Sequence, residues 1–154
     1  MSDKEKGATL TKSIDLNRSA LDAFSPENDP MEYATTCMNL AICLETLAMR
    51  VGAPRGKKLL GEAEQAYSSC LKIFEKEKYA AQWAMTQENL ALLSEEIAES
   101  SHGCEAITSI DAGIIHLKNA LTVYDVEHTP IRYDHVMKVM DRLKAKRNDL
   151  SKTA

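Results

Sequence analysis

The stretch QWAMTQENLA, residues 82–91, decides the fold because EYATTCMNLA, residues 32–41, repeats its pattern fifty positions earlier. In both stretches an aromatic residue is followed by alanine, and a Leu-Ala pair begins seven residues after the aromatic one. The same offset aligns further apolar sets: Leu10, Leu60 and Ile110; Leu21, Leu71 and Leu121; Phe24, Phe74 and Tyr124; Tyr33, Trp83 and Tyr133; Leu40, Leu90 and Met140. A fixed period of this length is typical of a supersecondary unit that stacks into a solenoid.

The segments between the few breaks have the apolar spacing of helices. Only 4 prolines and 6 glycines interrupt 154 residues, and apolar residues recur at spacings of three and four. This spacing predicts six helices, over about residues 9–24, 30–50, 58–76, 79–100, 106–126 and 129–148. Because short connections favour antiparallel neighbours, we expect an all-α stack of antiparallel hairpins at about 9–50, 58–100 and 106–148. Together they form one repeat domain, residues 9–148, between flexible ends at 1–8 and 149–154.

Composition places the chain among ordinary globular proteins. Hydrophobic residues make up 44% and charged residues 27% of the chain, and no apolar run approaches the roughly 18 residues of a membrane-spanning helix. The charged N-terminus lacks the apolar core of a secretory signal, which predicts a cytoplasmic location without membrane contact. The cysteines show no metal or redox spacing, and those inside apolar helical patterns are expected to be buried free thiols: Cys37, Cys43 and Cys70, with Cys104 in a loop.

Charge is distributed unevenly along the chain. Seven acidic residues lie between Glu75 and Glu105, against Lys76 and Lys78, whereas the segment from Pro130 onward is predominantly basic. The net charge of −4 nevertheless argues against general nucleic-acid binding. The basic run at residues 144–147 is explained by its place at a helix C-terminus, where positive charge complements the helix dipole.

The two stretches quoted above resemble the first helix of a tetratricopeptide repeat, in the longer-loop bacterial form related to the kinesin light chain type. The second helix of that repeat carries small, aromatic and small residues at spacings of four and three, which Ala63, Tyr67 and Cys70 match. The positions Gly113, Leu117 and Ala120 match it more loosely. The resemblance implies a right-handed superhelical stack. It also implies two complete repeats that begin near Pro30 and Ala80, with an orphan helix at each end and a polar last helix as a cap.

In this family the first helices line a concave groove that accepts a peptide or a partner's helix. Carried over by position, the resemblance implies a partner-binding groove formed by three stripes: Thr35, Met38, Ile42 and Glu45; Met85, Glu88, Leu92 and Glu95; and His135, Lys138 and Arg142. The apolar members would contact an amphipathic helix or extended peptide, and the charged members would orient it. The family's carboxylate clamp is incomplete, because Met38 and Ile42 occupy the positions of its lysine and asparagine.

No enzyme signature accompanies the repeat. A phosphate-binding glycine loop, GxSxG, HExxH and paired metal-binding cysteines are missing from the sequence, so we expect no catalytic residues, no metal site and no cofactor. The leading hypothesis is a non-enzymatic protein–protein interaction module. Two alternatives stay open: a helical bundle that binds a small ligand or metal through its histidines and groove acids, and a scaffold whose copies assemble end to end through the orphan helices.

Overall fold

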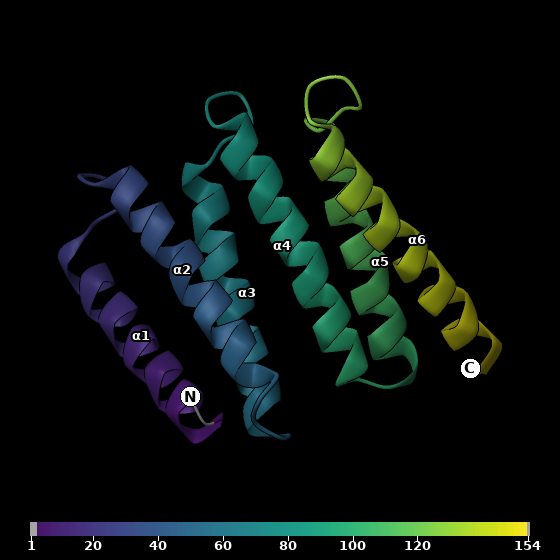
Figure 1. Cartoon of the computed structure of the whole chain (residues 1–154), viewed down its shortest axis with the longest axis horizontal. Coiled ribbons are helices and arrows are strands. Elements are labelled where there is room, and N and C mark those ends of the chain that lie inside the picture. Colours follow the sequence, from purple (N-terminus) through teal and green to yellow (C-terminus); the bar gives the residue numbers. More distant parts are fainter. Residues whose placement is uncertain (1–2, 154) are drawn as a thin grey trace. The chain divides into compact units, whose positions relative to one another are not determined.

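The computed structural model describes residues 3–153 and consists of six helices, with no strand in that range. The helices are α1 Asp3–Ala23, α2 Pro30–Ala48, α3 Arg55–Ile73, α4 Ala80–Glu99, α5 Gly103–Ala120 and α6 Pro130–Thr153 (Figure 1). The predicted all-α class and the predicted number of helices are therefore confirmed. Helix α2 begins at Pro30 and α4 at Ala80, where the two complete repeats were expected to begin.

The fifty-residue repeat recurs in the hydrogen bonds of the backbone. Each of the connections after α1, α3 and α5 contains an aromatic residue whose N–H donates to the carbonyl four residues earlier. Two more bonds of the same kind then lead into the next helix. The equivalent bonds join Phe24 to Ala20, Phe74 to Cys70 and Tyr124 to Ala120; Asp29 to Ser25, Tyr79 to Glu75 and Thr129 to Asp125; and Tyr33 to Asp29, Trp83 to Tyr79 and Tyr133 to Thr129. The aligned aromatic residues thus mark one recurring loop geometry.

The chain forms two compact units, divided after Phe74. In the first unit α2 packs antiparallel against both α1 and α3 (Figure 1). Its buried side chains include Ile14, Leu44, Tyr67, Cys70 and Phe74, and an ion pair of 2.6 Å between Arg18 and Glu62 joins α1 to α3. Burial raises the pKa of the Cys70 thiol to about 12, so this cysteine is an inert core residue.

In the second unit α5 packs against both α4 and α6. The core of this unit is formed by twelve buried residues: Ala84, Ala91, Ala98, Ala106, Ile110, Leu117, Ala120, Tyr124, Val136, Val139, Met140 and Leu143. Gly113 of α5 faces both neighbours, because a Cβ atom there would lie 3.0 Å from Leu143 Cδ1 and 3.3 Å from the carbonyl oxygen of Ala91. The close approach explains a glycine where the equivalent position fifty residues earlier is Ala63.

The helix bounds differ from the prediction most at the two ends of the chain and at the end of α5, which stops at Ala120 and not near residue 126. Helix α1 begins at Asp3 and α6 continues to Thr153, so most of the expected flexible ends 1–8 and 149–154 is helical; residues 1, 2 and 154 lie outside the described residues. The predicted hairpin 58–100 is divided between the two units, because their boundary falls after Phe74. The tightest helix pairs are α2 with α3 and α4 with α5.

The four cysteines are free, and Cys37 and Cys70 are buried as predicted, whereas Cys43 is half-buried and Cys104 exposed. Trp83 is partly buried against the core of the second unit, with Lys76 Nζ 5.4 Å from the ring centroid. Among the described residues, no helix combines the length and the apolar character needed to cross a membrane.

Candidate functional site

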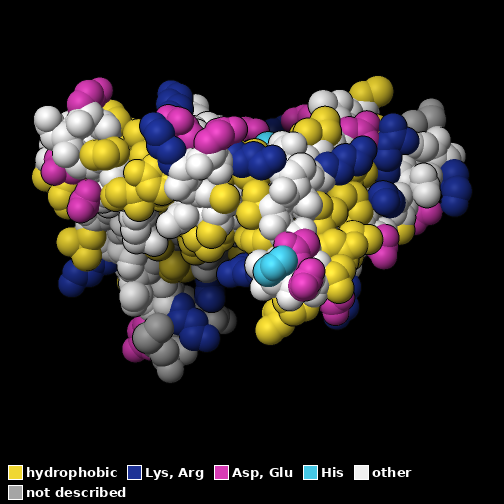
Figure 2. Space-filling view, turned by 90° about the horizontal axis from the view of Figure 1, so that it is seen from above, with side chains coloured by type: hydrophobic (Ala, Val, Ile, Leu, Met, Phe, Trp, Pro, Cys, Tyr) yellow, Lys and Arg dark blue, Asp and Glu magenta, His cyan; other side chains and the backbone are white. Residues whose placement is uncertain are grey.

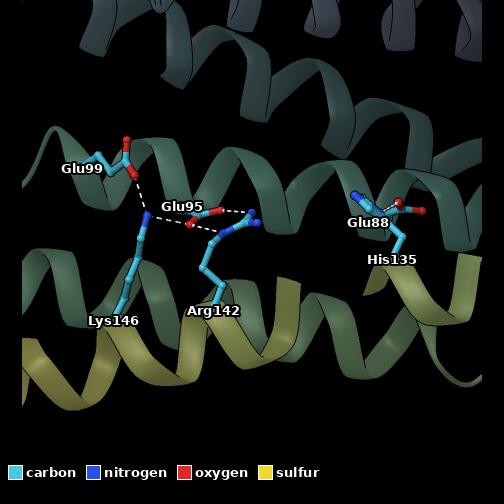
Figure 3. A network of polar contacts seen from close by, with 6 residues as sticks. All are labelled: Glu88, Glu95, Glu99, His135, Arg142 and Lys146. Atoms are coloured by element: carbon cyan, nitrogen blue, oxygen red, sulfur yellow. Dashed lines mark hydrogen bonds and ion pairs between the residues drawn. The ribbon is translucent and has the colours of Figure 1, made fainter. Parts of the chain in front are cut away.

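Acidic side chains of α4 and basic side chains of α6 form a regular series of contacts, which we call the acid–base ladder (Figure 3). Glu88 Oε1 lies 2.7 Å from His135 Nδ1. Arg142 donates to both carboxylate oxygens of Glu95 at 2.8 and 2.6 Å, and Lys146 contacts both Glu95 and Glu99. The pairs Glu88–His135, Glu95–Arg142 and Glu99–Lys146 are each separated by 47 residues. A constant separation means that α4 and α6 run parallel, as Figure 1 shows.

The acids of the ladder are more deeply buried than the bases. Glu88 is 3% and Glu95 is 6% exposed, whereas the side chains of His135 and Arg142 remain about half exposed. Because a buried carboxylate must be paired, the basic residues of α6 are needed to hold these acids in the fold. The hydrogen bond from Arg142 lowers the pKa of Glu95, and the same contact raises the pKa of Arg142.

Other basic residues of α6 are also paired within the second unit. Arg132 Nη1 lies 3.2 Å from Glu88 Oε2, and Arg147 forms a two-fold contact with Asp111 of α5. The uneven charge of the sequence therefore serves to dock α6 onto α4 and α5. Three lysines do not take part in this docking: Lys138 reaches the exposed Asp134 of its own helix, at 3.9 Å, Lys152 reaches Asp149 of the same helix, and Lys144 has no ion pair with another described residue.

On α2 the predicted groove stripe is only partly accessible. Thr35 is exposed and Ile42 is 43% exposed, but Met38 is buried at 8%. Glu45 accepts a hydrogen bond of 3.1 Å from the hydroxyl of Tyr67. Burial, together with this carboxylate, raises the pKa of Tyr67 well above its usual range. Of this stripe, Thr35 and Ile42 are therefore accessible, whereas Glu45 is hydrogen-bonded to Tyr67 within the fold.

On α4 and α6 the structure brings together some of the predicted residues and separates others. Glu88 meets His135 and Glu95 meets Arg142, whereas Lys138 contacts none of the predicted groove residues. Met85 is half-buried, and Leu92 packs against the core of the second unit. The resemblance implies that Glu88 and Glu95 present their charge to a partner, but both carboxylates are buried and paired with basic residues of α6.

Several residues of this face were not singled out from the sequence. Arg132 and Lys146 complete the ladder, and Gln87 Oε1 lies 2.7 Å from His116 Nδ1 and accepts from Asn119 at 3.3 Å. Burial lowers the pKa of His116, which favours its neutral form. The missed signal is the recurrence of opposite charges at a constant separation of 47 residues. His128 contacts only Asp125, in the loop before α6.

Within the described part of the chain, no group of three or more histidine, cysteine, aspartate and glutamate side chains is arranged to hold a metal ion. No family model, curated protein or solved structure matches the chain. The site must therefore be interpreted from its own geometry.

Acid is expected to destabilise the second unit through Glu95. Its folded-state pKa is lowered by Arg142, so its contribution to stability is present above the unfolded-state pKa of about 4.3 and is lost as pH falls through the lower folded value. Urea unfolding at pH 7, 5 and 3.5 should show a loss of stability at the acidic end. The loss should be smaller in Glu95→Gln. Glu99→Gln, which changes an exposed partner of Lys146, is the control and should lose as much stability as the wild type.

Proposed function

We propose that the chain is a non-enzymatic interaction module built from tetratricopeptide-like repeats. It binds a peptide or partner helix on the exposed faces of α2, α4 and α6, the helices that correspond to the first helix of the repeat. The support is the repeat itself: α2, α4 and α6 begin fifty residues apart and carry side chains of different character at equivalent positions. A repeat of this kind supplies a scaffold, and its variable positions supply specificity. Fold alone would not support the proposal, so the surface chemistry must carry it.

The observation that carries the proposal is the sign of the charge that α6 exposes. Glu88 and Glu95 are buried, while His135, Lys138 and Arg142 remain half or more exposed on one side of α6. A partner that approaches this face meets basic groups, with the acids behind them. In the first unit the accessible part of the stripe is apolar at Ile42. The preferred partner of the second unit is therefore an acidic peptide, whereas the first unit by itself offers an apolar contact.

The face seen in Figure 2 carries no large patch of a single charge sign. Figure 2 shows acidic and basic side chains interspersed over the face that it views, with apolar side chains exposed between them. Mixed charge of this kind favours short-range recognition of a matched peptide over long-range attraction of a polyanion. Nucleic acid, a polyanion, is therefore not the preferred partner.

A charge reversal at Lys138 tests the proposal. Peptides selected on the wild type from a displayed library should be rich in Asp, Glu and large apolar residues, and Lys138→Glu should weaken their binding by roughly tenfold. Lys144→Glu is the matched control, because it changes the same charge on another side of the same helix. Affinities measured by fluorescence anisotropy at two salt concentrations would check this, since surface charge contacts weaken with salt.

Two results would contradict the proposal. One is equal weakening by both lysine variants, which would indicate a general charge effect. The other is a failure to select any peptide together with a mass that rises with concentration in light scattering, which would favour self-assembly of the chain.

A further inference from the structure

The basic side of α6 that is proposed to bind a peptide contains a histidine beside residues of constant charge. Lysine and arginine keep their charge through the neutral range, as at Lys138 and Arg142, whereas a histidine gains its charge only as the pH falls from about 8 to 5. The side chain of His135 is 51% exposed, so a partner bound to this side of the helix can meet it. The charge of the binding face therefore depends on pH through His135.

The contact with Glu88 fixes which nitrogen of the neutral ring carries the hydrogen. His135 Nδ1 lies 2.7 Å from Glu88 Oε1 (Figure 3). A carboxylate that is paired with Arg132 is ionised at neutral pH and can only accept a hydrogen bond. Nδ1 is therefore the protonated nitrogen, and it donates to Glu88.

The second ring nitrogen, Nε2, is left for a partner. It lies on the opposite edge of the ring from Nδ1, and it has no hydrogen-bond partner among the described residues. Because the Nδ1 edge lies against Glu88, which is 3% exposed, the exposed half of the ring is the edge that carries Nε2. In the neutral ring Nε2 is an acceptor, which repels a carboxylate of the partner. Protonation makes it a charged donor, which attracts the same carboxylate.

The contact between Glu88 and His135 does not need the ring to be charged. Glu88 Oε2 also accepts from Arg132 Nη1 at 3.2 Å, and the hydroxyl of Tyr124 is hydrogen-bonded to the same carboxylate. Burial, together with this carboxylate, raises the pKa of Tyr124 to about 12, so the hydroxyl stays protonated. The carboxylate thus has partners in both states of the histidine, and a change of charge at His135 is felt mainly at its exposed edge.

The other titratable side chains of the neighbouring elements have partners of their own. On α6, Asp134 and Lys138 face each other at 3.9 Å, and both are largely exposed. On α5 the corresponding pairs are Asp111 with Arg147 and His116 with Gln87. Protonation of His135 therefore adds its charge to the basic side of α6 without breaking another ion pair.

We propose that protonation of His135 at Nε2 strengthens the binding of acidic peptides to α6, so that this face binds them more tightly at pH 6 than at pH 8. The inference rests on the proposed function, because it concerns the regulation of the same face. Lys138 provides the charge that is present at both pH values, and His135 adds a second charge in the more acidic solution.

Hexaglutamate is a suitable probe, because glutamate side chains, with a pKa of about 4.3, stay ionised from pH 8 to pH 6. In titration calorimetry at constant ionic strength, its affinity for the wild type should rise by about fivefold between these pH values, the effect of one exposed charge contact. His135→Asn should abolish the rise, because the asparagine amide can donate to Glu88 in place of Nδ1 but offers no group in place of Nε2. His128→Asn is the matched control: this histidine is exposed in the same unit, contacts Asp125 in the loop before α6, and should not affect the rise.

Two further measurements keep the test independent of the stability of one variant. His135→Lys carries a charge at both pH values, so its affinity for hexaglutamate should be the same at pH 8 and pH 6. Imidazole ¹⁵N signals of the wild type at pH 8 should show the hydrogen of His135 on Nδ1, a result that needs no peptide.

The proposal is overturned if the hydrogen lies on Nε2 at pH 8, or if His135→Asn or His135→Lys shows the same rise in affinity as the wild type. Equal loss of the rise in His128→Asn would also overturn it, by showing a general charge effect. A failure of hexaglutamate to bind at any pH is a different result: it contradicts the acidic-peptide proposal for the second unit, and this inference with it.

Discussion

Replacement of both Arg142 and Lys146 by alanine is expected to destabilise the second unit by about 3 kcal/mol. The variant removes the hydrogen bonds and charges that neutralise Glu95, whose side chain is only 8% exposed. The isolated carboxylate must then either remain buried without a partner or draw water into the contact between α4 and α6. The value lies at the lower end for broken buried pairs because both basic side chains are partly exposed. Urea unfolding followed by fluorescence of Trp83, which lies in the same unit, measures the loss.

The matched control is Lys138→Ala combined with Lys144→Ala. It removes the same charge from the same helix, but neither lysine contacts a buried acid, so a loss below about 0.5 kcal/mol is expected. Addition of Glu95→Leu to the Arg142→Ala/Lys146→Ala variant should restore most of the stability, because an apolar side chain needs no charged partner there. If the two double variants lose equal stability, the ladder contributes only through net charge.

Replacement of Phe74 by alanine should cost about 3–4 kcal/mol. This side chain is 2% exposed and is among the largest that the first unit buries fully. The turn that it begins should survive, because the bond of 2.8 Å to Cys70 is made by the backbone N–H. The loss therefore measures packing. Because Trp83 lies in the second unit, its fluorescence does not report directly on the first, and unfolding should be followed by calorimetry or circular dichroism.

Phe24 provides the control for that experiment. It begins the equivalent turn fifty residues earlier and is only partly buried, so Phe24→Ala should cost about 1–2 kcal/mol, in proportion to the smaller apolar area removed from water. A conservative Phe74→Leu change should cost less than about 1.5 kcal/mol. Similar losses for Phe24→Ala and Phe74→Ala would mean that the aromatic residue stabilises the fold through the turn and not through its burial.

The starts of α2, α4 and α6 were the most predictable part of the fold. Pro30 and Pro130 occupy first positions of helices, where a missing N–H costs nothing, and the repeat places Ala80 between them. The outer ends of α1 and α6 were underestimated because their polar sequences lack apolar periodicity. Helix α1 nevertheless begins at Asp3, and Leu150 of α6 packs against the core of the second unit.

The sequence predicts which residues of the candidate site share a helix face, but not which of them are buried. Spacing of three and four correctly placed Glu88 and Glu95 on one side of α4, but a helical period does not reveal which neighbour covers that side. Lys138 illustrates the limit: it shares a side of α6 with Arg142, yet the residue 47 positions before it is Ala91, which offers no charge.

The charged residues follow the same spacing on α4 as on α6, and this affects how the last helix finds its register. If α6 slipped by one turn, Lys138 would oppose Glu95 and Arg142 would oppose Glu99, so two of the three ion pairs could form again. The same slip would bring Arg132 and His135 to the buried places of Val136 and Val139, and would remove Leu143 from its contact with Gly113. Charge attracts α6 without specifying one alignment, and the shape of the apolar core selects the alignment that is kept.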